Sequence, residues 1–236
     1  MPLLPPLRAR FARKTILVLA AIDAALVGLG LGLAPTTLTA SRQGWMGVGA
    51  ALAMLAAYAV VGVTASPALE RRHPRLLHVA GFFGLSIGLI FLVEMLLEYA
   101  FVPGSKGNER FGYLEFGGMF LCLFLAGLKG GQQTGKIRDG VLATIGSTMI
   151  GSLIWVGSLL STYYVFYGTA RQEKVLAADQ VLEDFARSGM TDLRAFIMQD
   201  YLGGVFFHLL FGLIAAALVG SIGGVVAKLA RRSDSG

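Results

Sequence analysis

Charge is scarce in this chain of 236 residues. Asp, Glu, Lys and Arg together make up 14% of the positions, whereas 55% are hydrophobic. Soluble domains carry about 25% charged residues, so this composition excludes an ordinary soluble domain. Cysteine is almost absent. Cys122 stands alone, which excludes an internal disulfide and a cysteine cage for a metal ion. Alternating strand patterns are missing as well, and none of the seven prolines falls inside a predicted span.

Signatures of chemistry are also missing. The net charge of +6 does not indicate nucleic-acid binding, because the basic residues flank apolar segments instead of forming one patch. Residues 84–88 read Gly-Leu-Ser-Ile-Gly and match the G-x-S-x-G motif of hydrolases. That motif requires a strand-to-helix turn, and here it falls within a long apolar run. We therefore predict no catalytic residue, no metal site and no cofactor, and interpret the chain as a non-enzyme.

What the chain does have is six long apolar stretches. A membrane span needs about 20 apolar residues, and a helix keeps all of its backbone groups paired in lipid. The sequence predicts an all-α, polytopic membrane bundle forming one domain over residues 1–236. The predicted spans are about 15–34, 45–66, 77–101, 112–128, 140–167 and 203–228. The first expected partner of the chain is the lipid bilayer. The first stretch exceeds the 7–15 apolar residues of a signal peptide, so we interpret it as a retained helix.

Lysine and arginine predict the orientation. Thirteen of them lie in segments on the side of the N-terminus and seven on the other side. Cytoplasmic loops carry the excess of these residues, so both termini are expected in the cytoplasm, as a multi-pass protein of the cell inner membrane. Residues 169–202 are expected to form an amphipathic helical hairpin on the outer side, with Thr191 capping its second helix.

Small residues recur at a spacing of four. Such spacing lets membrane helices approach closely, and we expect it to serve packing within the bundle. An interface with other membrane subunits, or with a second copy of the chain, is the alternative. The same spacing joins Gly28 to Gly32 in the first span. The remaining packing positions are Gly84, Gly88, Gly204, Gly212, Ala216, Gly220 and Gly224.

Few ionisable residues fall inside the spans, where their burial is costly and marks candidate functional sites. They are Asp23, Glu94, Glu98, Glu115 and His208. The topology places the last four at one depth, where they could bind a cation or relay protons. The structural alternative is that Glu98 and Glu115 reach the headgroup region. For Asp23, the structural alternative is a hydrogen bond to hydroxyl groups of the span at 140–167.

Three segments in the C-terminal two thirds of the chain carry a family resemblance. They are a basic turn with glycine (135–140), an acidic amphipathic hairpin (181–190) and a glycine-rich final helix with a basic end (220–228). From about residue 78 onward the layout resembles an uncharacterised bacterial family of small multi-spanning membrane proteins, a domain of unknown function. The resemblance implies no activity. Function therefore stays between an accessory or assembly subunit and, as the alternative, a small proton or cation transporter or channel.

Overall fold

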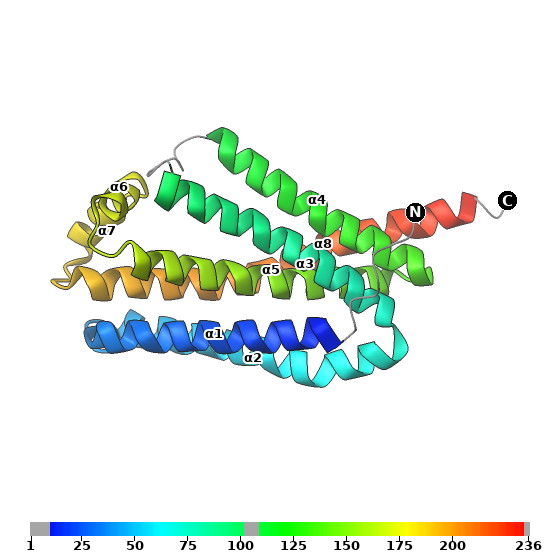
Figure 1. Cartoon of the computed structure of the whole chain (residues 1–236), viewed down its shortest axis with the longest axis horizontal. Coiled ribbons are helices and arrows are strands. Elements are labelled where there is room, and N and C mark those ends of the chain that lie inside the picture. The colour runs from blue at the N-terminus through cyan, green and yellow to red at the C-terminus, as the bar shows by residue number, and fades with distance from the viewer. Residues whose placement is uncertain (1–9, 102–108, 234–236) are drawn as a thin grey trace.

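The computed structural model describes residues 10–101 and 109–233. Within them all regular structure is helical, and six helices are long and apolar enough to cross a membrane (Figure 1). This confirms the predicted all-α, six-span membrane bundle. The spans are α1 (Arg10–Leu33), α2 (Arg42–Arg72), α3 (Pro74–Leu96), α4 (Glu109–Thr134), α5 (Ile137–Val165) and α8 (Leu193–Ser233). The shorter elements are the 3₁₀ turn η1 (Pro35–Leu38), the π-helical turn η2 (Leu97–Phe101), α6 (Ala170–Ala178) and α7 (Val181–Ser188).

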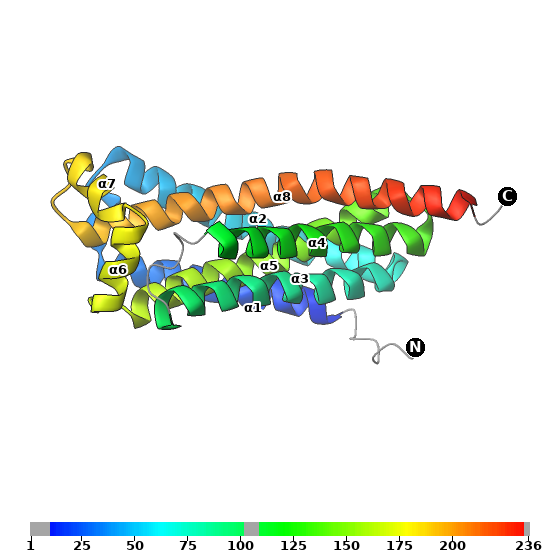
Figure 2. The ribbon, with the colours of Figure 1, turned by 90° about the horizontal axis from the view of Figure 1, so that it is seen from above.

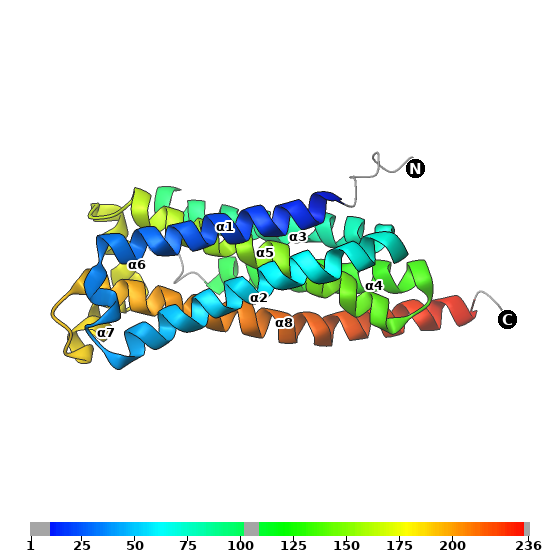
Figure 3. The same cartoon turned by 90° about the horizontal axis from the view of Figure 1, so that it is seen from below.

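Successive spans run in opposite directions. The helix α1 begins, and α8 ends, at the same end of the bundle, which we call the terminal end (Figure 1). The opposite end, which we call the hairpin end, carries η1, α6 and α7 (Figure 3). The long helix α8 covers about 60 Å at 1.5 Å per residue, twice the roughly 30 Å of the hydrocarbon core.

The helix α5 forms the centre of the molecule. It packs against α1, α3, α4 and α8, and Leu153, Val156 and Leu160 on it are completely buried. The pair α1 and α2 lies on one side of α5 and α8, and α3 and α4 lie on the other (Figures 1 and 2). Because residues 140–165 contain no charged side chain, α5 suits a position surrounded by other helices.

The outward faces of the spans are apolar. Exposed large side chains occur on every span, and patches of this extent are unusual on soluble monomers. They include Val18, Val60, Phe82, Leu89, Leu121, Phe211, Leu218 and Ile222. Contact with membrane lipid accounts for this surface.

Glycines bring α4, α5 and α8 into backbone contact towards the terminal end. A Cβ added to Gly127 of α4 would lie 2.8 Å from the Cα of Gly220 in α8. One added to Gly140 of α5 would lie 3.1 Å from the Cα of Gly224. We call this contact the glycine seam. Side chains at these positions would force the helices apart.

The other packing positions differ in their surroundings. Gly84 and Gly88 of α3 face Ile150 and Ile154 of α5, and Gly212 of α8 lies near Thr148 and Ser152 of α5. Ala216 is fully buried. Open space surrounds Gly204, and also Gly28 and Gly32 of α1. The expectation that Gly28, Gly32 and Gly204 pack within the bundle is therefore wrong.

The largest departures from the expected boundaries are in α2, α4 and α8. The helix α2 continues through Pro67 to Arg72, because a proline removes only one backbone hydrogen bond and its neighbours maintain the helix. The helix α4 continues to Thr134. The second hairpin helix and the last span form the single helix α8, so only α6 and α7 pair across the hairpin end. Asp192, not Thr191, caps α8, since its Oδ1 accepts the N–H groups of Arg194 and Ala195.

Candidate functional site

Asp23 is a fully buried acid at the interface between α1 and α5. It lies on α1 with 0% of its surface exposed. Neither of its carboxylate oxygens has a hydrogen-bond partner in the part of the chain that the structure describes. Gly157 of α5 faces it, and a Cβ added there would lie 3.0 Å from Asp23 Oδ1. The absence of a side chain at Gly157 therefore makes room for this carboxyl group at the interface between α1 and α5.

Several hydroxyl groups of α5 donate to carbonyl oxygens of the same helix. Ser158 Oγ donates to the Ile154 carbonyl oxygen at 2.7 Å, and Thr162 Oγ1 donates to the Ser158 carbonyl oxygen at 2.9 Å. Such bonds to the preceding turn are typical of Ser and Thr in membrane helices. The expectation that Asp23 bonds to hydroxyl groups of this span is therefore wrong.

At the hairpin end, three acids lie near a pair of tyrosines. Glu98 lies on the π-helical turn η2 and is 1% exposed, and Glu94 precedes it by one turn of α3, half-buried. Glu98, Asp179 and Glu94 lie near the Tyr99 phenol. Tyr99 Oη and Tyr201 Oη, the latter on α8, lie 2.9 Å apart. Single π-helical turns next to α-helices are frequent at functional sites.

Glu94, Glu98 and Glu115 all interact with other residues, and Glu115 lies half-buried on α4. Among residues 10–101 and 109–233, no group of three His, Cys, Asp or Glu side chains could hold a metal ion.

His208 belongs to an aromatic cluster. Its ring stacks on the Trp155 indole of α5, with centroids 3.9 Å apart and planes 12° apart. Phe91 of α3 meets the His208 ring edge-on at 5.2 Å. This stacking fixes the orientation of the imidazole and joins α3, α5 and α8 through ring contacts.

A polar clamp ties the α1–α2 connection to α8, and the sequence did not indicate it. Gln199 of α8 donates from Nε2 to the Thr37 carbonyl oxygen at 2.9 Å and accepts from Ser41 Oγ at 2.9 Å. Asp192 accepts a hydrogen bond from the Thr36 hydroxyl. This bond, followed by the N–H groups of Ala195 and Arg194, lowers the pKa of the Asp192 carboxyl group.

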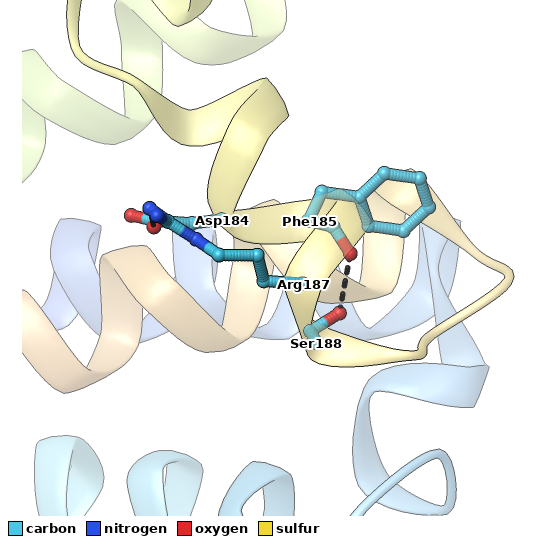
Figure 4. Close-up of polar contacts among 4 residues, drawn as sticks. All are labelled: Asp184, Phe185, Arg187 and Ser188. Carbon is cyan, nitrogen blue, oxygen red and sulfur yellow. Dashed lines mark hydrogen bonds and ion pairs between the residues drawn. The ribbon is translucent and has the colours of Figure 1, made fainter.

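In the hairpin, α7 is largely exposed, whereas α6 buries Gln172, Val175 and Leu176. In α7, Arg187 pairs with Asp184, and Ser188 Oγ donates to the Phe185 carbonyl oxygen at 2.7 Å (Figure 4). The Phe185 ring packs against Phe196 of α8, with ring centroids 5.5 Å apart. These contacts attach α7 to the first turns of α8.

Asp139 is a second buried acid that sequence reasoning missed. It lies in the first turn of α5 with 0% exposure, and its Oδ1 is 3.7 Å from the Nε of the exposed Arg138. The only signal in the sequence was a single acid within a basic turn. A carboxylate in this position interacts favourably with the N-terminus of its own helix.

No protein-family model, curated protein or solved structure matches this chain. The resemblance to a family of small membrane proteins stays a prediction.

Proposed function

We propose that this chain is a non-enzymatic subunit of a membrane complex, and that the outer face of α1 binds another membrane helix. The observation that carries the proposal is the open space around Gly28 and Gly32. Other glycine pairs with the same spacing of four, Gly84 with Gly88 and Gly220 with Gly224, are covered by neighbouring helices.

The exposed face of α1 extends over three turns. Ala21, Ala24 and Ala25 are exposed next to Gly28 and Gly32, and all five lie within about 100° around the helix. Small residues let two helix backbones approach, and in lipid this close packing is the main source of helix association. The covering helix belongs to another subunit or to a second copy of the chain.

The membrane and its sides belong to the same proposal. The terminal end carries Arg71, Arg72 and Arg75 near the turn between α2 and α3, and Arg231 and Arg232 at the end of α8. An excess of basic residues marks the cytoplasmic side. We therefore place this end in the cytoplasm and the chain in the cell inner membrane.

The test is a variant with Gly28→Leu and Gly32→Leu, extracted in native lipid discs and analysed for mass and crosslinked partners. The wild type is expected as a complex of defined composition, and the variant as a folded monomer. Ile22→Phe serves as the control. It adds bulk at an exposed position of α1 that lies about a quarter-turn or more around the helix from Gly28 and Gly32. A wild type that is monomeric in native discs, with no crosslinked neighbour, would overturn the proposal.

A second candidate is proton or cation passage through the acids at the hairpin end. Glu98 supports it, because a nearly inaccessible acid on a π-helical turn next to Tyr99 is costly to retain without a use. Proton and cation flux into liposomes, compared between the wild type and Glu98→Gln, separates the candidates. Flux that the substitution abolishes supports transport, and equal or absent flux in both contradicts it.

A further inference from the structure

The inner face of α1 carries a group that neither function uses. Asp23 lies about 140° around the helix from Gly28, with its carboxyl group fully buried against α5 and without a hydrogen-bond partner in the described residues. An ionised carboxylate that has lost its water and gained no partner is among the most costly groups to bury. Either a neighbouring group or a bound ligand must therefore neutralise the charge of this carboxylate.

No neighbouring side chain supplies the compensating charge. Residues 141–160 of α5 and 79–93 of α3 contain no titratable group, and residues 15–33 of α1 contain only Asp23 itself. Residues 47–63 of α2 contain only Tyr58, whose hydroxyl donates to the Leu209 carbonyl oxygen at 2.9 Å.

The other titratable groups nearby are similarly engaged. Tyr164 of α5 donates its hydroxyl proton to the Leu26 carbonyl oxygen, one turn from Asp23, at 2.7 Å. Residues 205–227 of α8 contain only His208, whose ring stacks on Trp155. The hydroxyl groups of Tyr58 and Tyr164 each donate their single proton to a backbone carbonyl oxygen, so neither can donate to Asp23.

The chemistry of the site selects the ligand. Calcium and magnesium ions require about six or more oxygen ligands, and the described residues offer no group of three His, Cys, Asp or Glu that could hold a metal. A proton needs a single oxygen atom. We propose that Asp23 is a proton-binding site at the interface between α1 and α5, occupied in the folded bundle, and that its proton keeps α1 seated on α5.

Gly157 is the second part of this site. A neutral carboxyl group fits against the α5 backbone because Gly157 has no side chain there. Loss of the proton would place a negative charge in the interface, which requires water to enter or α1 to move away. This inference concerns the inner face of α1 and holds whether or not the outer face binds a partner.

The direct test is infrared spectroscopy of the full chain in liposomes at neutral pH. The wild type is expected to show the carbonyl band of a protonated carboxylic acid, Asp23→Asn to lack it, and Glu98→Gln to retain it. Identical bands in the wild type and Asp23→Asn would overturn the proposal. If Asp23→Asn fails to fold, the wild type alone decides: dicyclohexylcarbodiimide, which reacts with protonated carboxyl groups in apolar surroundings, should modify Asp23. An unmodified Asp23 counts against the site.

Stability gives an independent readout. Between about pH 5 and 8 an unfolded Asp23 is ionised, so a folded form that holds the proton loses up to tenfold in its folding equilibrium constant per pH unit. The wild type should therefore lose thermal stability with rising pH more steeply than Asp23→Asn. Parallel pH profiles would contradict the proposal. A failure here leaves the binding of a partner helix to Gly28 and Gly32 untouched, because that surface is tested by complex mass.

Discussion

At the scale of single residues, the polar clamp shows how a few hydrogen bonds orient two spans. Gln199 satisfies a backbone carbonyl oxygen of η1 and the side chain that caps α2, Ser41. Gly44 of α2 is what allows this approach. A Cβ added at Gly44 would lie 2.1 Å from the Thr37 carbonyl oxygen and 2.3 Å from Gln199 Nε2.

Gly44→Ala is therefore expected to break the clamp and to destabilise the protein by about 1–3 kcal/mol. Gly49→Ala, on the same helix but in open space, is the control. It should leave stability unchanged or raise it by up to about 1 kcal/mol, because alanine favours the helix. Thermal unfolding in detergent measures both variants. Equal effects of the two substitutions would show that the clamp is absent.

The Asp192 carboxyl group adds a dependence on pH. Its pKa is lowered in the folded chain, first by the Thr36 hydroxyl. The stabilisation is present above the unfolded pKa of about 3.9 and is lost as the pH falls through the folded value. The stability of Thr36→Val should therefore decline less on acidification below about pH 4 than that of the wild type. A matching decline in both proteins, followed by thermal melts, would disprove the contribution of this bond.

At the scale of elements, the glycine seam explains why α4 continues past its expected end. Residues 130–131 had the composition of a turn, yet a Cβ on Gly131 would lie 3.0 Å from the Cα of Gly224 in α8. Packing of one helix backbone against another stabilises a segment whose intrinsic helix propensity is low.

Gly127→Ala is expected to push α4 from α8 and to lower stability by about 1–3 kcal/mol. Gly117→Ala is the matched control, since it lies on the same helix with no atom nearby to meet its Cβ. Unfolding by SDS titration compares the two. If Gly127→Ala is as stable as Gly117→Ala, the close approach of these helices does not hold.

At the scale of the whole molecule, six antiparallel spans place the terminal end and the hairpin end on opposite membrane faces. On a Cys122→Ala background, Ser188→Cys and Ser233→Cys provide one thiol at each end. An impermeant maleimide added to intact cells should label the Ser188→Cys variant only, and Ser233→Cys should react after lysis. Labelling of both thiols from one side would contradict the six-span arrangement, and the reverse pattern would invert the proposed orientation.

The sequence alone determined the class of this protein. Apolar runs of about 20 residues have few alternatives to membrane helices, so six spans and the exposed hairpin segment followed from composition and periodicity. The expected second helix of the hairpin is instead the first part of α8. Residues 193–233 contain no proline that would end the helix.

Only the tertiary structure decided which face of each helix is covered. Gly28 with Gly32 and Gly84 with Gly88 share one spacing, yet the first pair faces open space and the second faces α5. The sequence also did not indicate that Asp23 is buried opposite Gly157, that His208 stacks on Trp155, or that Gln199 forms the clamp. The spacing along a helix records which residues share a face, but what lies against that face depends on residues far away in the chain.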